Sequence, residues 1–477
     1  MLQNTYYHLL YPDNPYYFAL WHIASPSSKI VATYQSLKEK KMKIFNHGIT
    51  SATLLLLLSC VPSAYSSGLQ ITQQSGPALL RSMGGAGLSG DDLGDLFYNP
   101  ASLWLYEDAA IQVGVTAIST DIDVVNTGSL QSIQGRMLPV QGANGRLDDS
   151  NVVPRGYAVL KNKDNNNYQY AVHVTPTFGQ ETHYADNWFG RYHAVDSTLK
   201  VLDYGLIVGR KTSGNSYISV SPIIQQLDTR LTRALQFSPS LPDGSVILDG
   251  DSTELGYALG WSTSRQLDGE TGNAARFGIS FRSKTSHKIN GTTTINTPLG
   301  PDVRNATADL VLPETVYLNY WTPVGSSRKS SIGLTARWTN WSRNQAIIIN
   351  SENLPPDVTP QNWKDSWMLG IGGTVNLSNN WNLLLGTGLD KTPVQDSTGR
   401  TARNPGADTT WFSIGAQYLH NHVHRWSFGV VYWDFDDGDI QTTAGLGFPP
   451  FGADVLNGTA KYGATTGVVL EYQRTFK

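Results

Sequence analysis

The sequence has almost no cysteine, few charged residues and no long apolar run. The single Cys, at position 60, excludes a disulfide framework and any site built from several thiolates. Only 15 % of the 477 residues are charged, and the net charge of -3 gives no electrostatic reason to expect a nucleic-acid partner. No apolar stretch of about 18 residues is present, which excludes membrane-spanning helices. A soluble β-rich protein and a transmembrane β-barrel, whose strands are only half apolar, remain.

The N-terminal part carries the pattern of an export signal. A basic start at Met42-Lys43 precedes the apolar core 54–58, and Ala64-Tyr65-Ser66 is a small-x-small cleavage pattern. We therefore expect a signal peptide over 42–66 and a mature chain that begins at Ser67.

Residues 1–41 precede this signal. We expect them to be a non-native or extended leader, either from an overlong start at Met1 or from an unusually long signal peptide. Residues 57–60, Leu-Leu-Ser-Cys, also fit a lipoprotein box, which is a third interpretation of this region.

The mature chain alternates apolar and polar residues with a period of two, which places the two sets on opposite faces of a strand. In the last strand Val468, Leu470 and Tyr472 share one face, while Glu471 and Gln473 share the other. The same pattern recurs at 168–174, 255–261, 277–281, 332–338, 412–418 and 426–432.

The connections between these segments alternate between short polar turns and stretches of roughly 15 to 35 residues, as in outer-membrane barrels. Trp residues lie near several segment ends, for example Trp341, Trp381 and Trp426, as interfacial girdles require. We therefore predict an all-β fold, a closed antiparallel transmembrane barrel of about fourteen strands over 108–477. An even number places both termini on the periplasmic side.

Residues 67–107 precede the first alternating strand and contain turn-forming residues. Five Gly between 76 and 90 allow close backbone approach, and Asn99-Pro100 sets a turn. We predict that this segment folds inside the barrel as a plug, or hatch. A flexible periplasmic leader is the alternative.

Several blocks, in order along the chain, resemble the FadL-type transporters of long-chain fatty acids and aromatic hydrocarbons. They are 67–70, Asp91-Asp92 with Asn99-Pro100-Ala101, 176–179, 188–192, 256–260, 281–284, 312–314, 338–342 and 390–394. The resemblance implies a monomeric fourteen-stranded barrel with a hatch, an external apolar groove and uptake without an energy source. It also implies that Asp91, Asp92, Asn99, Pro100 and Ala101 belong to the hatch.

The sequence departs from this family in two places. Residues 405–409, Pro-Gly-Ala-Asp-Thr, lack the Arg of the family's acidic-then-Arg pattern. The segment 343–349 has no Lys where a carboxylate partner is expected. Neutral hydrocarbons therefore stay open as cargo beside fatty acids.

Candidate ligand contacts lie in two predicted external loops. Leu227, Leu231 and Leu235 are spaced by four, which predicts one stripe of a short helix, with Phe237 nearby. The other loop contributes Trp188, Phe189 and Tyr192. Seating of the loop on its neighbours is the alternative role of these side chains.

Pro176 lies in the apolar phase of the third strand, where it cannot donate a ladder hydrogen bond, and Phe178 and Gly179 follow it. We predict a local break in the wall and a lateral opening there. A harmless strand end is the alternative.

Arg282, Arg337 and Arg425 occupy the polar phase of their strands, so we expect them in the lumen. A buried Arg needs a partner, and the plug carboxylates Asp91, Asp92 and Asp95 are the expected partners.

We therefore expect passive uptake of hydrophobic compounds across the bacterial outer membrane, with lipid and lipopolysaccharide as surroundings. An adhesin or a general porin-like channel is the alternative. We expect no enzyme activity, no catalytic residues, no metal and no cofactor, because no serine motif stands out and the His residues are scattered.

Overall fold

The computed structural model describes residues 67–133, 135–160, 167–212, 214–237, 241–267, 274–444 and 454–477. The predicted leader (1–41), signal peptide (42–66) and lipoprotein box lie outside the described residues and stay predictions. Across the described part, no helix has both the length and the apolar character needed to cross a bilayer.

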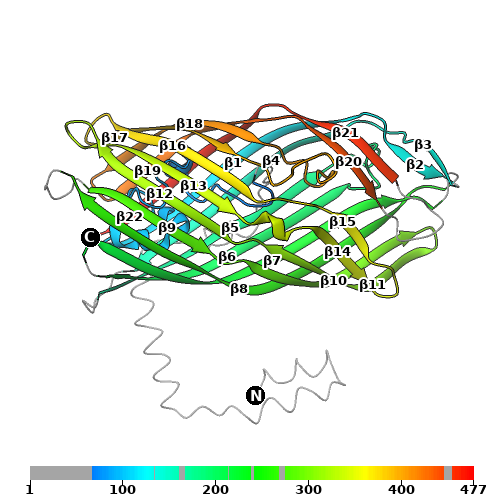
Figure 1. The fold of residues 1–477 in the computed structure, drawn as a ribbon, viewed down its shortest axis with the longest axis horizontal. Coiled ribbons are helices and arrows are strands. Elements are labelled where there is room, and N and C mark those ends of the chain that lie inside the picture. The colour runs from blue at the N-terminus through cyan, green and yellow to red at the C-terminus, as the bar shows by residue number, and fades with distance from the viewer. Residues whose placement is uncertain are drawn as a thin grey trace, which may run out of the picture. The chain divides into compact units, whose positions relative to one another are not determined.

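The first described segment forms three short helical elements, shown in blue in Figure 1. They are α3 (Gly76–Leu80), α4 (Asp95–Tyr98) and the 3-10 helix η3 (Pro100–Leu105). Ser75 and Asn99 cap α3 and η3 by accepting hydrogen bonds from Ala78 N and Ala101 N. Pro follows each cap in the first turn, where its missing N–H costs nothing.

All other regular elements are strands, most of them long. They are β1 (Ala109–Asn126), β2 (Leu130–Ile133), β3 (Arg136–Pro139), β4 (Gly145–Leu160), β5 (Tyr168–His183), β6 (Asp196–Lys211), β7 (Ser216–Leu235), β8 (Gly244–Gln266), β9 (Ala274–Arg282), β10 (Thr285–Thr297) and β11 (Gly300–Leu312). The rest are β12 (Thr315–Val324), β13 (Ser330–Thr339), β14 (Ala346–Ser351), β15 (Asp357–Pro360), β16 (Ser366–Asn376), β17 (Trp381–Asp390), β18 (Thr409–His420), β19 (His424–Phe435), β20 (Gly438–Ala444), β21 (Asp454–Tyr462) and β22 (Thr465–Phe476), with the 3-10 helix η4 (Trp341–Arg343) after β13.

Antiparallel pairing runs around a closed wall, because β1 pairs with β4 on one side and with β21 and β22 on the other. Six of the wall strands are interrupted, so that two consecutive elements together form one strand. These are β9 with β10, β11 with β12, β13 with β14, β15 with β16, β19 with β20, and β21 with β22. With β1, β4 to β8, β17 and β18 as single strands, the described wall has fourteen strands, which confirms the predicted fold. The β2–β3 hairpin projects from the long connection after β1.

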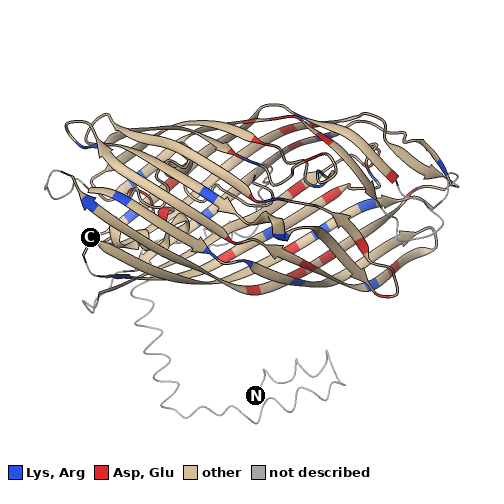
Figure 2. Cartoon of the chain, viewed as in Figure 1, with Lys and Arg blue, Asp and Glu red and all other residues tan. Residues whose placement is uncertain are grey.

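The two faces of the wall follow the predicted alternation. On β22, Val468 is 58 % and Leu470 49 % exposed on the outside, while Glu471 and Gln473 are buried on the inside. Aromatic rings pack against one another in tilted pairs at the outer edge of the short-turn end, where Trp381 contacts Tyr418 and Trp426 contacts Tyr472. Asp and Glu concentrate in the other half of the barrel, which carries the long connections (Figure 2).

The helical segment fills the lumen and touches the wall closely. A Cβ on Gly84 would overlap the backbone of Gly372 in β16, and a Cβ on Gly372 would overlap the Arg81 carbonyl oxygen. The plug turns here through Ser82 and Met83, both in the left-handed region with φ of 48° and 69°. Glycine on both surfaces is therefore what lets the two backbones meet.

Replacement of Gly372 by Ala should displace the plug turn at 81–85, because neither backbone can move far enough to make room for the added Cβ. We expect a loss of about 1–3 kcal/mol in the free energy of unfolding, measured in detergent with denaturant. Limited proteolysis should also cut the plug faster than in the unmodified protein.

Gly209→Ala is the matched control, because its nearest contact would be the flexible Leu103 side chain, at 3.3 Å, and the nearest backbone atom would lie at an ordinary contact distance of 3.7 Å. Equal stability and equal plug protection in the two variants would contradict the close-approach interpretation.

Candidate functional site: a plugged barrel with an amphipathic cavity

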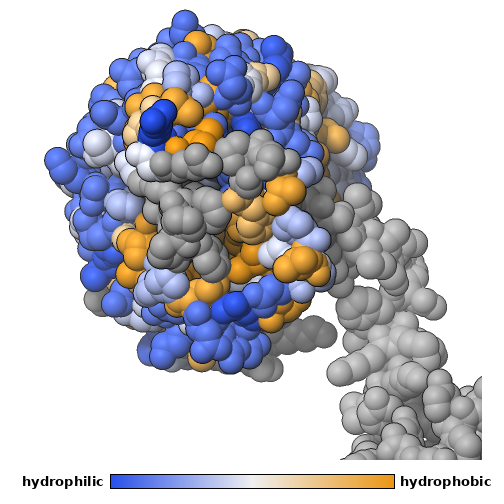
Figure 3. Space-filling view, turned by 90° about the vertical axis from the view of Figure 1, so that its right-hand side faces the viewer, coloured by the Kyte–Doolittle hydropathy of each residue, from blue (hydrophilic) through white to orange (hydrophobic). Residues whose placement is uncertain are grey.

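A cavity of about 420 Å³ lies between the plug and the end that carries the long connections. This is the size range of ligand sites for small hydrophobic molecules. Figure 3 looks onto that end, where apolar side chains gather around a hollow inside a hydrophilic rim.

The apolar side of the cavity comes from inward positions of the wall strands. Leu199, Leu231, Val246, Leu248, Ile289, Leu310, Ile347 and Ile349 line it. These residues come from β6, β7, β8, β10, β11 and β14, so the period-two pattern of each strand delivers its side chains to one apolar surface. Leu69, at the start of the plug, also lines the cavity.

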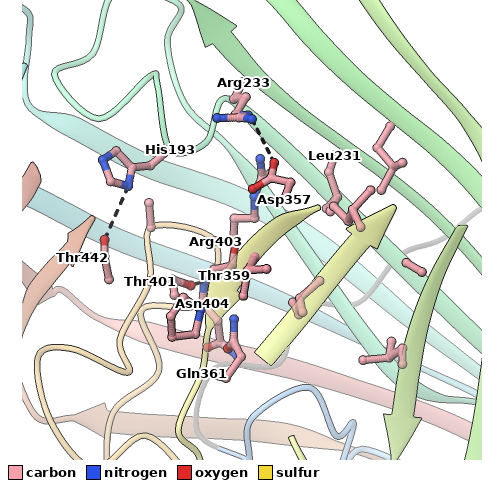
Figure 4. A pocket seen from close by; sticks show the side chains of 18 of the residues that line it. His193, Leu231, Arg233, Asp357, Thr359, Gln361, Thr401, Arg403, Asn404 and Thr442 are labelled. Atoms are coloured by element: carbon pink, nitrogen blue, oxygen red, sulfur yellow. Dashed lines mark hydrogen bonds and ion pairs between the residues drawn. The ribbon is translucent and has the colours of Figure 1, made fainter. Parts of the chain in front are cut away.

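The opposite side of the cavity is polar and charged (Figure 4). Arg233 of β7 forms an ion pair of 2.9 Å with Asp357 of β15. Arg403, from the connection after β17, donates to the Asp196 carbonyl oxygen (2.9 Å), to Ser197 Oγ (2.7 Å) and to the Thr232 carbonyl oxygen (3.0 Å). None of these three acceptors is a carboxylate, so the Arg403 charge is held by neutral groups.

Burial and neighbouring cations decide the charge states here. Burial lowers the pKa of Arg403 to about 10, with Arg233 acting in the same direction, so the guanidinium stays charged at neutral pH. Burial, together with Arg233 and Arg403, lowers the pKa of His193 to about 3, so His193 is neutral. The polar side of the cavity therefore contains a charged guanidinium without a directly bonded carboxylate, although Asp357 and Asp196 act on its charge from further away and raise its pKa.

The predicted ligand residues divide between the cavity and the packed interior. Tyr192 and Leu231 line the cavity. Trp188 and Phe189 are buried in a cluster where Trp188 stacks on Tyr184 at 3.9 Å. Leu227, Leu235 and Phe237 do not line the cavity; Leu227 is buried beside Phe178 in another apolar cluster.

The predicted short helix through Leu227, Leu231 and Leu235 is wrong, because β7 runs as strand through all three. A spacing of four keeps residues on one face of a strand as well as of a helix, so the spacing alone did not distinguish the two. Cross-strand pairing with β8 over the whole length of β7 selects the strand.

The hatch residues form a hydrogen-bonded core in the plug. Asp95 accepts from Gly87 N (2.9 Å) and Gly90 N (2.8 Å), and Asp92 accepts from Gln112 Nε2 of the wall (2.7 Å). Asn99 caps η3 and donates to the Trp261 carbonyl oxygen, which joins Pro100 and Ala101 to the wall. Asp91 pairs with Arg81 at 2.9 Å within the plug.

The lumenal arginines pair differently from the prediction. Arg282 forms an ion pair with Asp203 of β6 at 2.5 Å, and Arg337 forms one with Asp390 of β17 at 2.9 Å. Neither uses a plug carboxylate, because both acids lie on nearby wall strands. Arg425 donates to the main-chain oxygen of Asp91, not to its carboxylate.

Two further buried groups connect plug and wall and were not anticipated from the sequence. Arg155 of β4 pairs with Glu471 of β22 at 2.7 Å, and Glu471 accepts from Gly76 N at the start of α3. Polar residues in the inward phase of β4 and β22 were the available signal.

The wall has a break beside Pro176. Pairing between β4 and β5 ends at Gly156 opposite Val174, although β4 stays paired with β1 up to Gly145. The same register, continued by two residues, would place Pro154 opposite Pro176, and neither has an N–H to donate. β5 has a register shift between Pro176 and Phe178 in its pairing with β6.

The plug covers this break from inside. Ile71 N donates to the Thr177 carbonyl oxygen (2.9 Å), and Gly179 N donates to the Leu69 carbonyl oxygen (2.8 Å). Gln70 and Phe178 form an antiparallel bridge. The start of the plug therefore supplies backbone partners that β4 does not.

A membrane-spanning barrel with an internal plug and an amphipathic cavity defines a class of outer-membrane transport protein. The family described as outer membrane protein transport protein (OMPP1/FadL/TodX) matches residues 57–472. The chain belongs to this family of bacterial outer-membrane transporters of hydrophobic compounds, which is a transport and not an enzyme family.

Individual relatives are distant in sequence. The chain is 21 % identical over 423 residues to a long-chain fatty acid transport protein of Escherichia coli O6:H1, covering 80 % of this chain and 90 % of that one. A solved Pseudomonas aeruginosa FadL homologue matches with a TM-score of 0.74 at 19 % identity, over 86 % of this chain and 100 % of that one. The Ralstonia pickettii toluene transporter TbuX matches with a TM-score of 0.60 at 14 % identity, over 85 % and 100 %. These structures show a shared fold.

The plug carboxylates make stability depend on pH. Burial raises the pKa of Asp95 from 3.8 to about 6; Arg81 lowers it and Asp91 raises it. The folded state therefore binds this proton more tightly than the unfolded state, and the free energy of unfolding should rise as the pH falls from 7 through 6 and level off near 4. Asp95→Asn should reduce that rise in denaturant titrations of the detergent-solubilised protein.

Asp396→Asn is the control, because Asp396 is an exposed loop carboxyl that bonds only to its own turn. An unchanged pH profile in Asp95→Asn would show that burial of Asp95 does not govern the plug's stability.

Proposed function

We propose that the protein takes up long-chain hydrophobic acids, with the long connections outside the cell and both termini in the periplasm. Cargo enters the cavity from the long-connection end, binds with its carboxylate at Arg403, and leaves sideways through the break at Pro154 and Pro176. The chain acts as a monomer within lipopolysaccharide and lipid, without an energy source. The observation that carries the proposal is the half-buried Arg403 guanidinium on the polar side of a cavity whose other side is apolar.

Capture needs no chemistry. Apolar surface gains about 25 cal/mol per Å² when it leaves water, so an apolar cavity opening toward solvent retains a hydrocarbon chain. The plug fills the lumen with buried side chains such as Leu79, Leu80 and Phe97, which does not favour an open aqueous pore.

Arg403 favours an acid over a neutral hydrocarbon. The hydrogen-bond acceptors of Arg403 are all neutral, and the carboxylates that act on its charge, Asp357 and Asp196, do not bond to it directly. A ligand carboxylate would give the guanidinium a directly bonded anion through charge-assisted hydrogen bonds. The relatives named for fatty acid and for toluene transport represent both cargo classes.

Arg403→Gln should weaken binding of a long-chain fatty acid by about 10- to 100-fold, the loss of one charged hydrogen bond of about 1.5–3 kcal/mol. Binding of the methyl ester should change little. Fluorescence displacement in detergent measures both affinities.

Lys391→Gln is the control, because Lys391 is an exposed cation of the same connection, paired with Asp408. Equal affinity of the unmodified protein for the acid and its methyl ester would exclude the headgroup role of Arg403.

The plug's first residues couple the cavity to the break. Leu69 lines the cavity, and its carbonyl oxygen holds Gly179 N beside the break. Arg337 and Asp390 hold Ser67, two residues earlier, through its hydroxyl. A ligand that displaces Leu69 would therefore withdraw the backbone partner that covers the opening.

Pro154→Val combined with Pro176→Val should let the β4–β5 ladder continue and slow uptake of labelled fatty acid at least about tenfold. The barrel should still fold, as judged by its heat-modifiable mobility on gels. Pro301→Val is the control, because Pro301 is exposed near the start of β11, opposite Asn296 and away from the break. Unchanged uptake in the double variant would exclude lateral exit at this place.

A further inference from the structure

Among the other interruptions of the wall, one lies between β8 and the strand formed by β9 and β10. Pairing with β9 ends at Ala258 opposite Arg282, and pairing with β10 resumes at Asp251 opposite Asn290. The chain from 283 to 289 has one residue more than the opposing stretch 252–257, so the register shifts across the interval. The two sides are joined at its edge by Tyr257 N to Ser283 Oγ (2.9 Å) and Ser283 N to the Tyr257 carbonyl oxygen (2.8 Å).

A small cavity of about 10 Å³ occupies this interval, with room for about one water molecule. It reaches from Tyr257, which is 46 % exposed on the outer face, to the interior side chains Phe178 and Leu312. Gly256 contributes only backbone atoms to the lining. A Cβ at this position would lie 3.0 Å from Thr285 Oγ1, so there is little room for a larger side chain. The wall is therefore thin here, and closed.

The interior side of this interval adjoins the large cavity. Thr285 and Leu312 line the small cavity, while Ile289 and Leu310 on the same two strands line the large one. Phe178, Ile289 and Leu312 belong to one packed apolar cluster. The lining of the small cavity itself is mixed: Phe178, Ile223 and Leu312 are apolar, whereas Gln225, Arg282, Ser283 and Thr285 are polar.

The outer side of the interval lies at the edge of the apolar belt. On β8, Leu255 is 78 % exposed and Leu259 45 %, whereas the outward positions nearer the long connections are Asp249 and Asp251. With the long connections outside the cell, this edge faces the outer leaflet of the membrane.

The two interruptions differ in what closes them. Residues 69–71 of the plug cover the break between β4 and β5. Every described residue that lines the small cavity belongs instead to the wall, and the closure at its edge consists of the Tyr257–Ser283 contacts. The wall contacts that close the second interval are therefore local, although two of its lining residues also contact the plug: Phe178 bridges Gln70, and the Arg282 guanidinium lies over the Phe97 ring.

We propose that this interval is a lateral entry, through which long-chain hydrophobic molecules already dissolved in the outer leaflet pass into the large cavity. The proposal rests on the proposed uptake function, and it adds a route that is independent of the external loops. Opening the wall here requires the two hydrogen bonds between Tyr257 and Ser283 to break, whereas opening a continuous antiparallel ladder would require many more to break. We therefore place the entry at this interval.

The test is a reversible cross-link across the interval. A Cβ on Gly256 would lie 3.4 Å from Ser283 Oγ, which suits a disulfide in Gly256→Cys with Ser283→Cys, made in a Cys60→Ser background. Uptake of a labelled long-chain fatty acid by cells should be at least about threefold slower with the bond formed, and should recover after reduction. Affinity for the same fatty acid in detergent should not change, because the loop route stays open.

Thr263→Cys with Phe277→Cys is the matched control, a cross-strand pair in the regular β8–β9 ladder. Its oxidation should leave uptake unchanged. Equal uptake by the oxidised and reduced Gly256–Ser283 variant, with bond formation verified by thiol titration, would overturn the lateral entry. Absence of uptake by the unmodified protein above an empty-vector control would overturn the proposed function itself.

A second measurement uses the unmodified protein in outer-membrane vesicles. A fatty acid with a photoreactive diazirine in its chain should label peptides that contain Tyr257 or Ser283, as well as peptides of the cavity. Labelling restricted to the cavity and the long connections would contradict entry at this interval.

Discussion

Backbone hydrogen bonding in a solvent that offers none is the constraint on which this structure depends. Each unpaired N–H or C=O in hydrocarbon costs several kcal/mol, so a membrane-spanning sheet must close on itself. Pairing of β1 with β22 meets that demand. Two places where pairing between neighbouring strands lapses, between β4 and β5 and between β8 and the β9–β10 strand, are therefore expensive features, and both adjoin the apolar interior.

The first lapse is specified by chemistry that a ladder cannot accommodate. Pro154 and Pro176 would face one another, and the plug start supplies the backbone partners that β5 then lacks. Closure of the wall therefore depends on the position of the plug. Residues 69–71 of the plug complete the backbone hydrogen bonding of β5, and Leu69 also lines the ligand cavity.

Buried charge holds the plug in register with the wall. Glu471, which pairs with Arg155, accepts a hydrogen bond from Gly76 N. Asp390, which pairs with Arg337, accepts one from the Ser67 hydroxyl. A buried ion pair contributes little net stability, but loss of one partner is costly, so these groups act mainly as positional constraints. Arg403 is built differently, with neutral acceptors around its charge, which is the arrangement expected where a ligand supplies the anion.

The local pattern of the sequence was sufficient for the barrel, its strand number and its internal plug. Three signals carried these predictions: period-two alternation, the alternation of short and long connections, and the turn residues in 67–107. Each can be recognised in a short stretch of sequence without knowledge of which other segment packs against it. Pro176 was visible for the same reason, since a missing N–H is a property of one residue. What only the tertiary structure decided was partnership: strand or helix at Leu231, Asp203 as the partner of Arg282, Pro154 opposite Pro176, and Arg403 beside Arg233. These contacts depend on strand register and on closure of the barrel, which bring together segments far apart in the chain. A local sequence pattern does not specify which distant segment a residue will meet.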